Sequence, residues 1–313
     1  MDGEAAPGQL VEGQVVYDPF MGRGTTVLEA ALLGHIPFGC DLNPLSIVLT
    51  RRRLFPPCLE EVAQRLRQID FASSDEFPQE LRVFFHADTL RAITALRRYM
   101  IERRASKSLD ALDEWICLVA LNRLTGHSPG FFSVYTLPPN QAVSVKAQRK
   151  INADRKQTPP PRNVPALILK KTRQLLRDCD SAARRALAAV APEAVLLTEP
   201  AARTPQIPAQ SVSLAITSPP SKLEDWQAAM TKVFHELHRV LKPGGHVAFE
   251  VGEVHAGKTR LEEAVLPCGV AAGLQPELVL INDQKFTKTA NCWSVDNMAK
   301  GTNTNRIVLF RRP

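Results

Sequence analysis

Short, largely apolar runs alternate with helical stretches at the start of the chain. Residues 14–17 form one such run, residues 25–33 have helical composition up to Gly34, and residues 36–40 form a second run. Short apolar runs are typical of buried strands, and a glycine after a periodic stretch is typical of a helix end. The pattern predicts a strand, turn, helix and strand, which is the opening of a doubly wound sheet.

The same alternation returns toward the C-terminus. Residues 226–241 have the periodicity of an amphipathic helix, closed by the Lys-Pro-Gly-Gly turn at 242–245. Five further apolar runs predict strands, the last two forming an antiparallel pair: residues 194–197, 211–216, 246–251, 278–281 and 307–310. Together these elements predict one α/β domain with a Rossmann-like sheet, composed of residues 1–54 and 191–313.

Residues 55–190 have a different pattern. They are mostly helical, as in 60–69 and 109–124, and a proline-rich, basic stretch at 126–165 predicts a surface loop between the helices. We interpret residues 55–190 as a largely helical insertion in the α/β domain.

The formal charge of the 313-residue chain is +7, and it is concentrated in the insertion. Residues 141–190 contain twelve Lys or Arg against three Asp or Glu, a local excess of nine. Such an excess favours a polyanionic partner, with nucleic acid foremost, and a solvated charged face is an equally good interpretation.

Cysteine spacing and hydropathy narrow the class of protein. The six cysteines are too widely spaced for a zinc site or a disulfide framework. No apolar run reaches the ~18 residues that span a bilayer, and the first residues lack the apolar core of a signal peptide. We expect a soluble, cytoplasmic protein with no metal and no membrane partner.

A candidate ligand cradle lies between the first strand and the first helix. The sequence Asp-Pro-Phe-Met-Gly-Arg-Gly-Thr-Thr at 18–26 supplies two glycines, which let the backbone approach a ligand, and a helix N-terminus with unpaired N–H groups. Asp41 ends the second strand, where an acid meets ribose hydroxyls. The third glycine of the dinucleotide fingerprint is missing, so a nucleoside without phosphates fits better than a dinucleotide.

A second candidate motif, Thr217-Ser218-Pro219-Pro220, follows the strand at 211–216. Two prolines fix an extended backbone without N–H donors and leave the carbonyls free to accept. The motif resembles the S-P-P signature of the DNA amino-methyltransferases, and this resemblance implies an exocyclic base amine as substrate, which is a poor nucleophile because its lone pair is delocalised into the ring. Hydrogen bonds from its protons to Ser218 and to the Pro219 carbonyl would favour a pyramidal nitrogen that attacks an activated methyl group in line, so positioning would carry most of the catalysis.

The two motifs resemble the D-P-F-x-G-x-G-T-T and S-P-P signatures of the DNA amino-methyltransferases, and the segment 41–44 resembles the acidic segment of that family. The resemblance implies a class I S-adenosyl-L-methionine-dependent fold, with S-adenosylhomocysteine as product. It further implies methylation of the exocyclic N4 amine of cytosine in double-stranded DNA with base flipping, a bacterial restriction-modification setting, and a target-recognition role for residues 55–190. By the same resemblance, the cofactor-binding residues would be Asp18, Pro19, Phe20, Gly22, Gly24, Thr25, Thr26, Asp41, Asn43 and Thr217, and the catalytic residues Ser218, Pro219 and Pro220.

Ser221 departs from the family pattern, which has an aromatic after Pro-Pro to stack on the flipped base. A weakened enzyme or a loop missing from this sequence after Pro220 would each explain it, and the missing loop is our preferred hypothesis. Adenine-N6 methylation, an RNA substrate and a chemically silent nucleic-acid-binding relative stay open, and the basic insertion argues against a small-molecule substrate. The aromatic-rich segment 126–135 could stack on bases or pack in a core. A homodimer also stays open.

Overall fold

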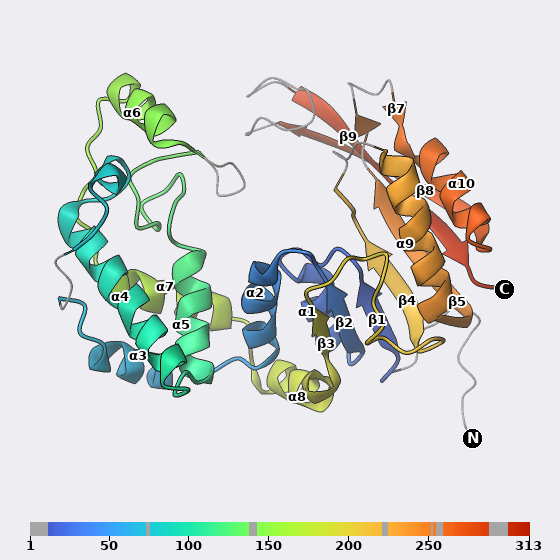
Figure 1. The fold of residues 1–313 in the computed structure, drawn as a ribbon, viewed down its shortest axis with the longest axis horizontal. Helices are drawn as coiled ribbons and strands as arrows, with labels where there is room; N and C mark the ends of the chain where they lie inside the picture. Colours follow the sequence, from blue (N-terminus) through green and yellow to red (C-terminus); the bar gives the residue numbers. More distant parts are fainter. Residues whose placement is uncertain are drawn as a thin grey trace. The chain divides into compact units, whose positions relative to one another are not determined.

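The computed structural model describes residues 12–72, 76–137, 143–220, 225–251, 253–254, 259–287 and 300–313. The chain forms two compact units (Figure 1). We call residues 1–55 with 185–313 the sheet unit, and residues 56–184 the helical unit. Within the described residues, no helix combines the length and the apolar character needed to cross a bilayer.

Seven strands form the sheet in the order β3-β2-β1-β4-β5-β9-β8 (Figure 1). The first five are parallel, whereas β9 pairs antiparallel with both β5 and β8. This order confirms the expected class I, Rossmann-like α/β fold, including the antiparallel pair at its C-terminal end. The strands are β1 (Val15–Asp18), β2 (Ile36–Cys40), β3 (Val195–Leu197), β4 (Val212–Thr217), β5 (Leu241–Val251), β8 (Gln275–Thr287) and β9 (Lys300–Arg311), and β6 (Glu253–Val254) and β7 (Thr259–Arg260) form a separate pair.

Helices pack on the sheet in two apolar clusters. In the larger one, helices α9 (Trp226–Val240) and α10 (Leu261–Ala271) meet the strands through aromatic residues such as Phe234 and Phe249, whose ring centroids are 4.8 Å apart. The second cluster contains residues of α1 (Thr25–Leu32), α2 (Pro44–Leu54), α8 (Ser181–Val190) and the 3₁₀ helix η2 (Ala191–Glu193). Separate clusters are expected of a sheet with helices on both faces.

The helical unit contains one helix that the sequence pattern did not predict. The stretch at 126–165 was expected to be a loop, but α6 (Val145–Asp154) lies within it. Ser144 caps this helix by accepting the Ala147 N–H at 3.1 Å, and most of the following residues are good helix formers. The other helices are α3 (Leu59–Gln68), η1 (Gln79–Val83), α4 (Ala87–Ala105), α5 (Ala111–Leu121) and α7 (Val164–Leu176).

Part of the expected surface loop is buried. Phe131 and Phe132 are 5% and 1% exposed, and the Val134 N–H donates to the Phe84 carbonyl at 2.8 Å. These two phenylalanines therefore pack in the core of the helical unit and present no ring to a base. His127, in the same segment, is exposed.

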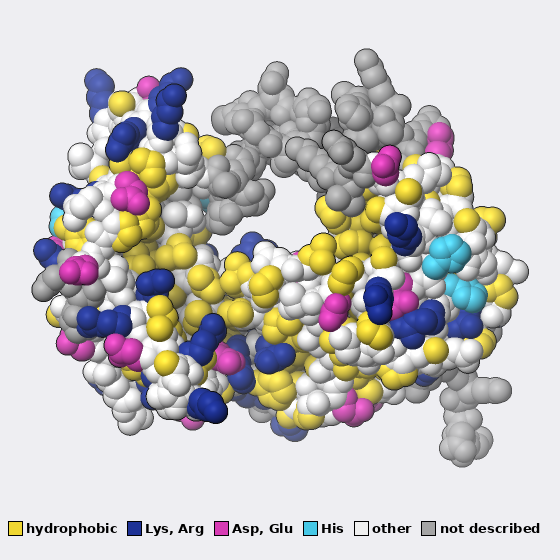
Figure 2. All heavy atoms as spheres, viewed as in Figure 1, with side chains coloured by type: hydrophobic (Ala, Val, Ile, Leu, Met, Phe, Trp, Pro, Cys, Tyr) yellow, Lys and Arg dark blue, Asp and Glu magenta, His cyan; other side chains and the backbone are white. Residues whose placement is uncertain are grey.

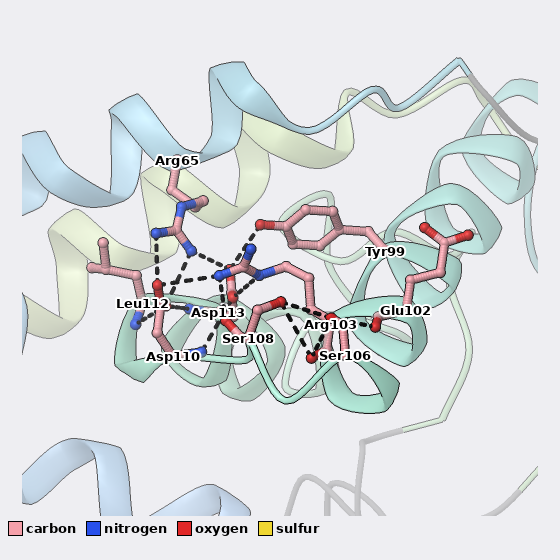
Figure 3. Close-up of polar contacts among 9 residues, drawn as sticks. All are labelled: Arg65, Tyr99, Glu102, Arg103, Ser106, Ser108, Asp110, Leu112 and Asp113. Atoms are coloured by element: carbon pink, nitrogen blue, oxygen red, sulfur yellow. Dashed lines mark hydrogen bonds and ion pairs between the residues drawn. The ribbon is translucent and has the colours of Figure 1, made fainter.

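A buried carboxylate braces three helices of the helical unit (Figure 3). Asp113 of α5 is fully buried and accepts hydrogen bonds from Arg65 of α3 at 2.5 Å and from Tyr99 and Arg103 of α4. Asp110 accepts two further bonds from Arg65, which lower the pKa of that carboxyl to about 2. A buried charge is tolerated when it is paired and hydrogen-bonded, as here.

Replacing Asp113 with Asn should lower the free energy of unfolding by about 3 kcal/mol, because two guanidinium groups lose their shared buried partner. Replacing Asp178 with Asn removes only an exposed pair with Arg177 and should leave the free energy of unfolding nearly unchanged. Denaturant unfolding of the full chain, followed by circular dichroism, measures both values. Equal losses would show that the buried network adds no stability beyond that of a surface ion pair.

Candidate active site

The residues singled out in the sequence lie at one edge of the sheet, at the carboxyl ends of three neighbouring parallel strands. β1 ends at Asp18, β4 ends at Thr217, and Asp41 directly follows β2. The strand order reverses between β1 and β4, and open α/β sheets bind ligands at such a switch point. The fold therefore brings together two motifs that are far apart in the sequence.

A buried hydrogen bond joins the two motifs. The Thr217 hydroxyl donates to Asp18 Oδ1 at 2.8 Å, and the Phe20 N–H donates to the same oxygen at 3.0 Å. Burial raises the pKa of the Asp18 carboxyl, and these two hydrogen bonds partly oppose that rise. Thr217 thus holds Asp18 in place, and the predicted contact of Thr217 with a cofactor stays a prediction.

Asp41 faces the glycine turn. Its Oδ2 accepts the Gly22 N–H at 2.9 Å, and its Oδ1 accepts the Asn43 N–H at 2.8 Å. Each carboxylate oxygen can accept a further hydrogen bond, so Asp41 retains capacity for two hydroxyl donors. Asn43 Oδ1 caps α2 by accepting the Leu45 N–H at 3.0 Å, and the predicted contact of Asn43 with a cofactor stays a prediction.

Two glycines shape the turn for different reasons. Gly22 has a φ of +48°, and a Cβ built there would have no neighbour nearer than the Phe20 carbonyl oxygen at 3.9 Å, so the space beside it is open. Gly24 has a φ of +73°, and its Cβ would lie 2.2 Å from Thr50 Oγ1. Gly24 is also the N-cap of α1 and has no side chain to cap the first N–H groups of that helix.

The other residues of the first motif differ in exposure. Pro19 is buried, and Phe20 is half-buried against the larger apolar cluster, where core packing explains it. Thr25 is exposed and Thr26 half-buried in the first turn of α1.

Positive charge lies beside the turn. The Arg53 guanidinium donates to the Arg23 carbonyl at 3.0 Å, and burial together with the nearby Arg23 charge lowers the pKa of Arg53. In the part of the chain that the structure describes, no group of His, Cys, Asp and Glu is arranged to hold a metal ion.

The second motif is held at both of its ends, by the bond from Thr217 to Asp18 and by a bond to Pro220. Ser218 and Pro220 are exposed at the end of β4, and the Trp226 indole N–H of α9 donates to the Pro220 carbonyl at 2.9 Å. Sequence reasoning missed Trp226, and its closeness to Pro220 in the sequence was the available signal. Ser221 and the missing loop hypothesised after Pro220 lie outside the described residues, which resume at 225.

The two turn glycines should respond differently to Ala. Gly24→Ala should lower the free energy of unfolding by more than about 2 kcal/mol, because a left-handed conformation and a clash with Thr50 act together. Gly22→Ala has only the conformational cost of about 1 kcal/mol. Thermal unfolding of both variants measures the difference. A larger loss for Gly22→Ala than for Gly24→Ala would contradict this description of the turn.

No family model matches the chain. Over 71 residues, or 23% of the chain, it is 27% identical to the type II methyltransferase M.MvaI of Kocuria varians, and it spans 14% of the length of that curated relative.

Solved structures similar to the chain include several methyltransferases. A TehB-like SAM-dependent methyltransferase from Corynebacterium glutamicum has a TM-score of 0.38 and 9% identity, over 97% of this chain and 83% of that one. A protein described as a candidate DNA modification methylase from Thermus thermophilus has a TM-score of 0.25 and 26% identity, over 34% and 47%. Geranyl diphosphate C-methyltransferase from Streptomyces coelicolor, in complex with S-adenosyl-L-homocysteine, has a TM-score of 0.41 and 10% identity, over 98% and 75%.

Proposed function

We propose that this chain is an S-adenosyl-L-methionine-dependent methyltransferase that acts on an exocyclic amine of a DNA base, with the N4 amine of cytosine as its preferred target. The hydrogen bond from Thr217 to Asp18 supports the proposal best, because it joins the residue before Ser218-Pro219-Pro220 to the residue that begins the first motif. A cofactor cradle and acceptors for an amine then share one edge of the sheet.

The residues of the cradle fit the cofactor. Asp41 has acceptor capacity left for two ribose hydroxyls, and the open space beside Gly22 would receive the methionine end. The uncapped N–H groups at the start of α1 and the nearby charge of Arg23 and Arg53 suit its carboxylate. When bound, S-adenosyl-L-methionine supplies a methyl group activated on a positively charged sulfur.

Positioning by Ser218 and Pro219 accounts for the chemistry. The Ser218 hydroxyl and the Pro219 carbonyl would each accept a hydrogen bond from one N–H of the target amine, which withdraws the nitrogen lone pair from conjugation with the ring. The bound cofactor would supply the methyl group, and the amine nitrogen held by Ser218 and Pro219 would lose one proton to solvent on methylation. Fixed acceptors need no rearrangement during the reaction, which is the main source of rate in such a site.

Two further observations support DNA and cytosine. The similarity over 71 residues is to a type II methyltransferase, and the helical unit carries a large excess of basic residues. The serine form of the S-P-P motif is similar to that of cytosine-N4 enzymes. A bacterial restriction-modification role, base flipping and a target-recognition role for the helical unit belong to the same proposal.

Incubation of the full chain with mixed-sequence double-stranded DNA and S-adenosyl-L-methionine, followed by digestion and mass spectrometry of the nucleosides, tests the proposal. N4-methylcytosine is the expected product. N6-methyladenine as the product would support methylation of a base amine but contradict cytosine as the target base. Cofactor binding without any methylated base would contradict the proposed activity on DNA.

Ser218→Ala should lower kcat at least about 100-fold, as loss of one positioned hydrogen-bonding group does in other enzymes. The dissociation constant of the cofactor should stay within about twofold, because Ser218 faces the amine. Ser213→Ala is the matched control, since Ser213 lies on β4, which Ser218 follows, and its buried hydroxyl has no hydrogen-bond partner among the described residues. An active Ser218→Ala variant would remove Ser218 from the proposed mechanism.

Trp226→Phe keeps an aromatic ring against the larger apolar cluster and removes the hydrogen bond to Pro220. A lost hydrogen bond of about 1 kcal/mol should lower kcat about fivefold, with cofactor affinity unchanged, because the acceptor segment is less firmly held. Trp115→Phe removes a similar bond, to Thr172 in the helical unit, and should lower stability without changing kcat. The same loss of kcat in both variants would show a general effect on folding instead.

A further inference from the structure

Helix α6 carries basic residues on a single face. Lys146, Arg149 and Lys150 are spaced three and four residues apart, which places them on one side of a helix, and all three are exposed. The ion pairs of the described residues give none of them a carboxylate partner. Figure 2 shows Lys and Arg side chains gathered over this helix.

The opposite face of α6 is held by buried amides. Gln148 is fully buried, and its Nε2 donates to the Tyr135 carbonyl at 3.0 Å and to Asn152 Oδ1 at 2.7 Å. Asn152 in turn donates to the Val83 carbonyl at 2.7 Å. Because these bonds fix the orientation of the helix, the basic face is directed outward.

The end of α6 is anchored by the same network. Lys156 has a φ of +48°, a conformation that costs about 1 kcal/mol in a residue other than glycine. The chain reverses at this residue, so that Gln157 donates to the Tyr135 carbonyl at 2.9 Å and to Asn152 Oδ1 at 2.8 Å. Both ends of the helix are therefore fixed to the segment that contains Tyr135.

The aromatic residues of this region are not available as stacking platforms. Phe131 and Phe132 are buried, and the Arg155 guanidinium lies over the Tyr135 ring at 3.7 Å. Proteins that bind single-stranded nucleic acid without sequence preference stack bases on aromatic faces, whereas binding to a duplex backbone needs outward-facing cations. A ten-residue helix is also about 15 Å long and fits the DNA major groove.

We propose that the outer face of α6, formed by Lys146, Arg149 and Lys150, binds the phosphate backbone of double-stranded DNA. This inference rests on the proposed function, and it names the surface of the helical unit that holds the substrate. Backbone contacts set the position of the protein on the duplex and carry no sequence information themselves.

A triple variant tests the proposal: Lys146→Gln, Arg149→Gln and Lys150→Gln. Binding of the full chain to a short fluorescent DNA duplex is measured by anisotropy at several salt concentrations. The variant should bind at least about tenfold more weakly at ~0.1 M salt. The negative slope of the logarithm of the association constant against the logarithm of the salt concentration should become shallower by about 2.7, or about 0.9 for each lost phosphate contact.

The matched control removes three exposed arginines elsewhere on the helical unit: Arg97→Gln, Arg104→Gln and Arg173→Gln. Its salt slope should change by less than about 1, since general attraction alone is weakened. Circular dichroism must show equal folding for both variants. Equal effects of the two triple variants would overturn the proposal, as would tighter binding to single-stranded DNA or to an RNA duplex.

Failure of this proposal is distinguishable from failure of the proposed function. If the wild-type chain binds duplex DNA through α6 but methylates no DNA, the proposed methylation is wrong and the proposed DNA-binding surface stands. If the wild-type chain methylates DNA and the α6 variant binds DNA as tightly as the wild type, the proposed surface is wrong and the proposed methylation stands.

Discussion

The Thr217 hydroxyl and the Asp18 carboxylate are 199 residues apart in the sequence and 2.8 Å apart in the structure. The candidate active site depends on this contact. Parallel pairing of β1 with β4 sets their carboxyl ends side by side, and the hydrogen bond then fixes which atoms meet. Both side chains are buried, so the bond forms in a medium of low dielectric, where leaving either partner unpaired would be costly.

Hydrophobic periodicity predicted the sheet unit closely where strands are buried. β2 has the predicted bounds, and α1 ends one residue earlier than expected. The expected turn at 242–245 lies within β5, which begins at Leu241, and the pairing of β5 with β4 shifts register there. β8 and β9 are longer than the apolar runs within them, because ladder hydrogen bonds continue through polar residues that leave no hydropathy signal. Helix α6 was missed for a related reason, since amides rather than apolar side chains hold its inner face.

The residue types of the candidate site were also predictable, because glycine, proline and acidic residues at strand ends have a direct chemical meaning. Their partners were not. Thr50 excludes any side chain at Gly24, and Trp226 holds Pro220, but each contact depends on how a separate helix packs. Such contacts follow from tertiary structure and have no local pattern in the sequence.

The two ends of the helical unit lie side by side. The Arg184 guanidinium donates to the carbonyls of Pro56 and Pro57, at 2.7 and 3.0 Å, so its last residue is bound to its first two. β2 and β3 pair in register across this whole insertion. An insertion whose ends meet can change in length or be exchanged for another while the strands keep their pairing, since loop closure costs little more for a longer segment. Such a helical unit can therefore evolve, or be engineered, as an interchangeable module while the sheet stays unchanged.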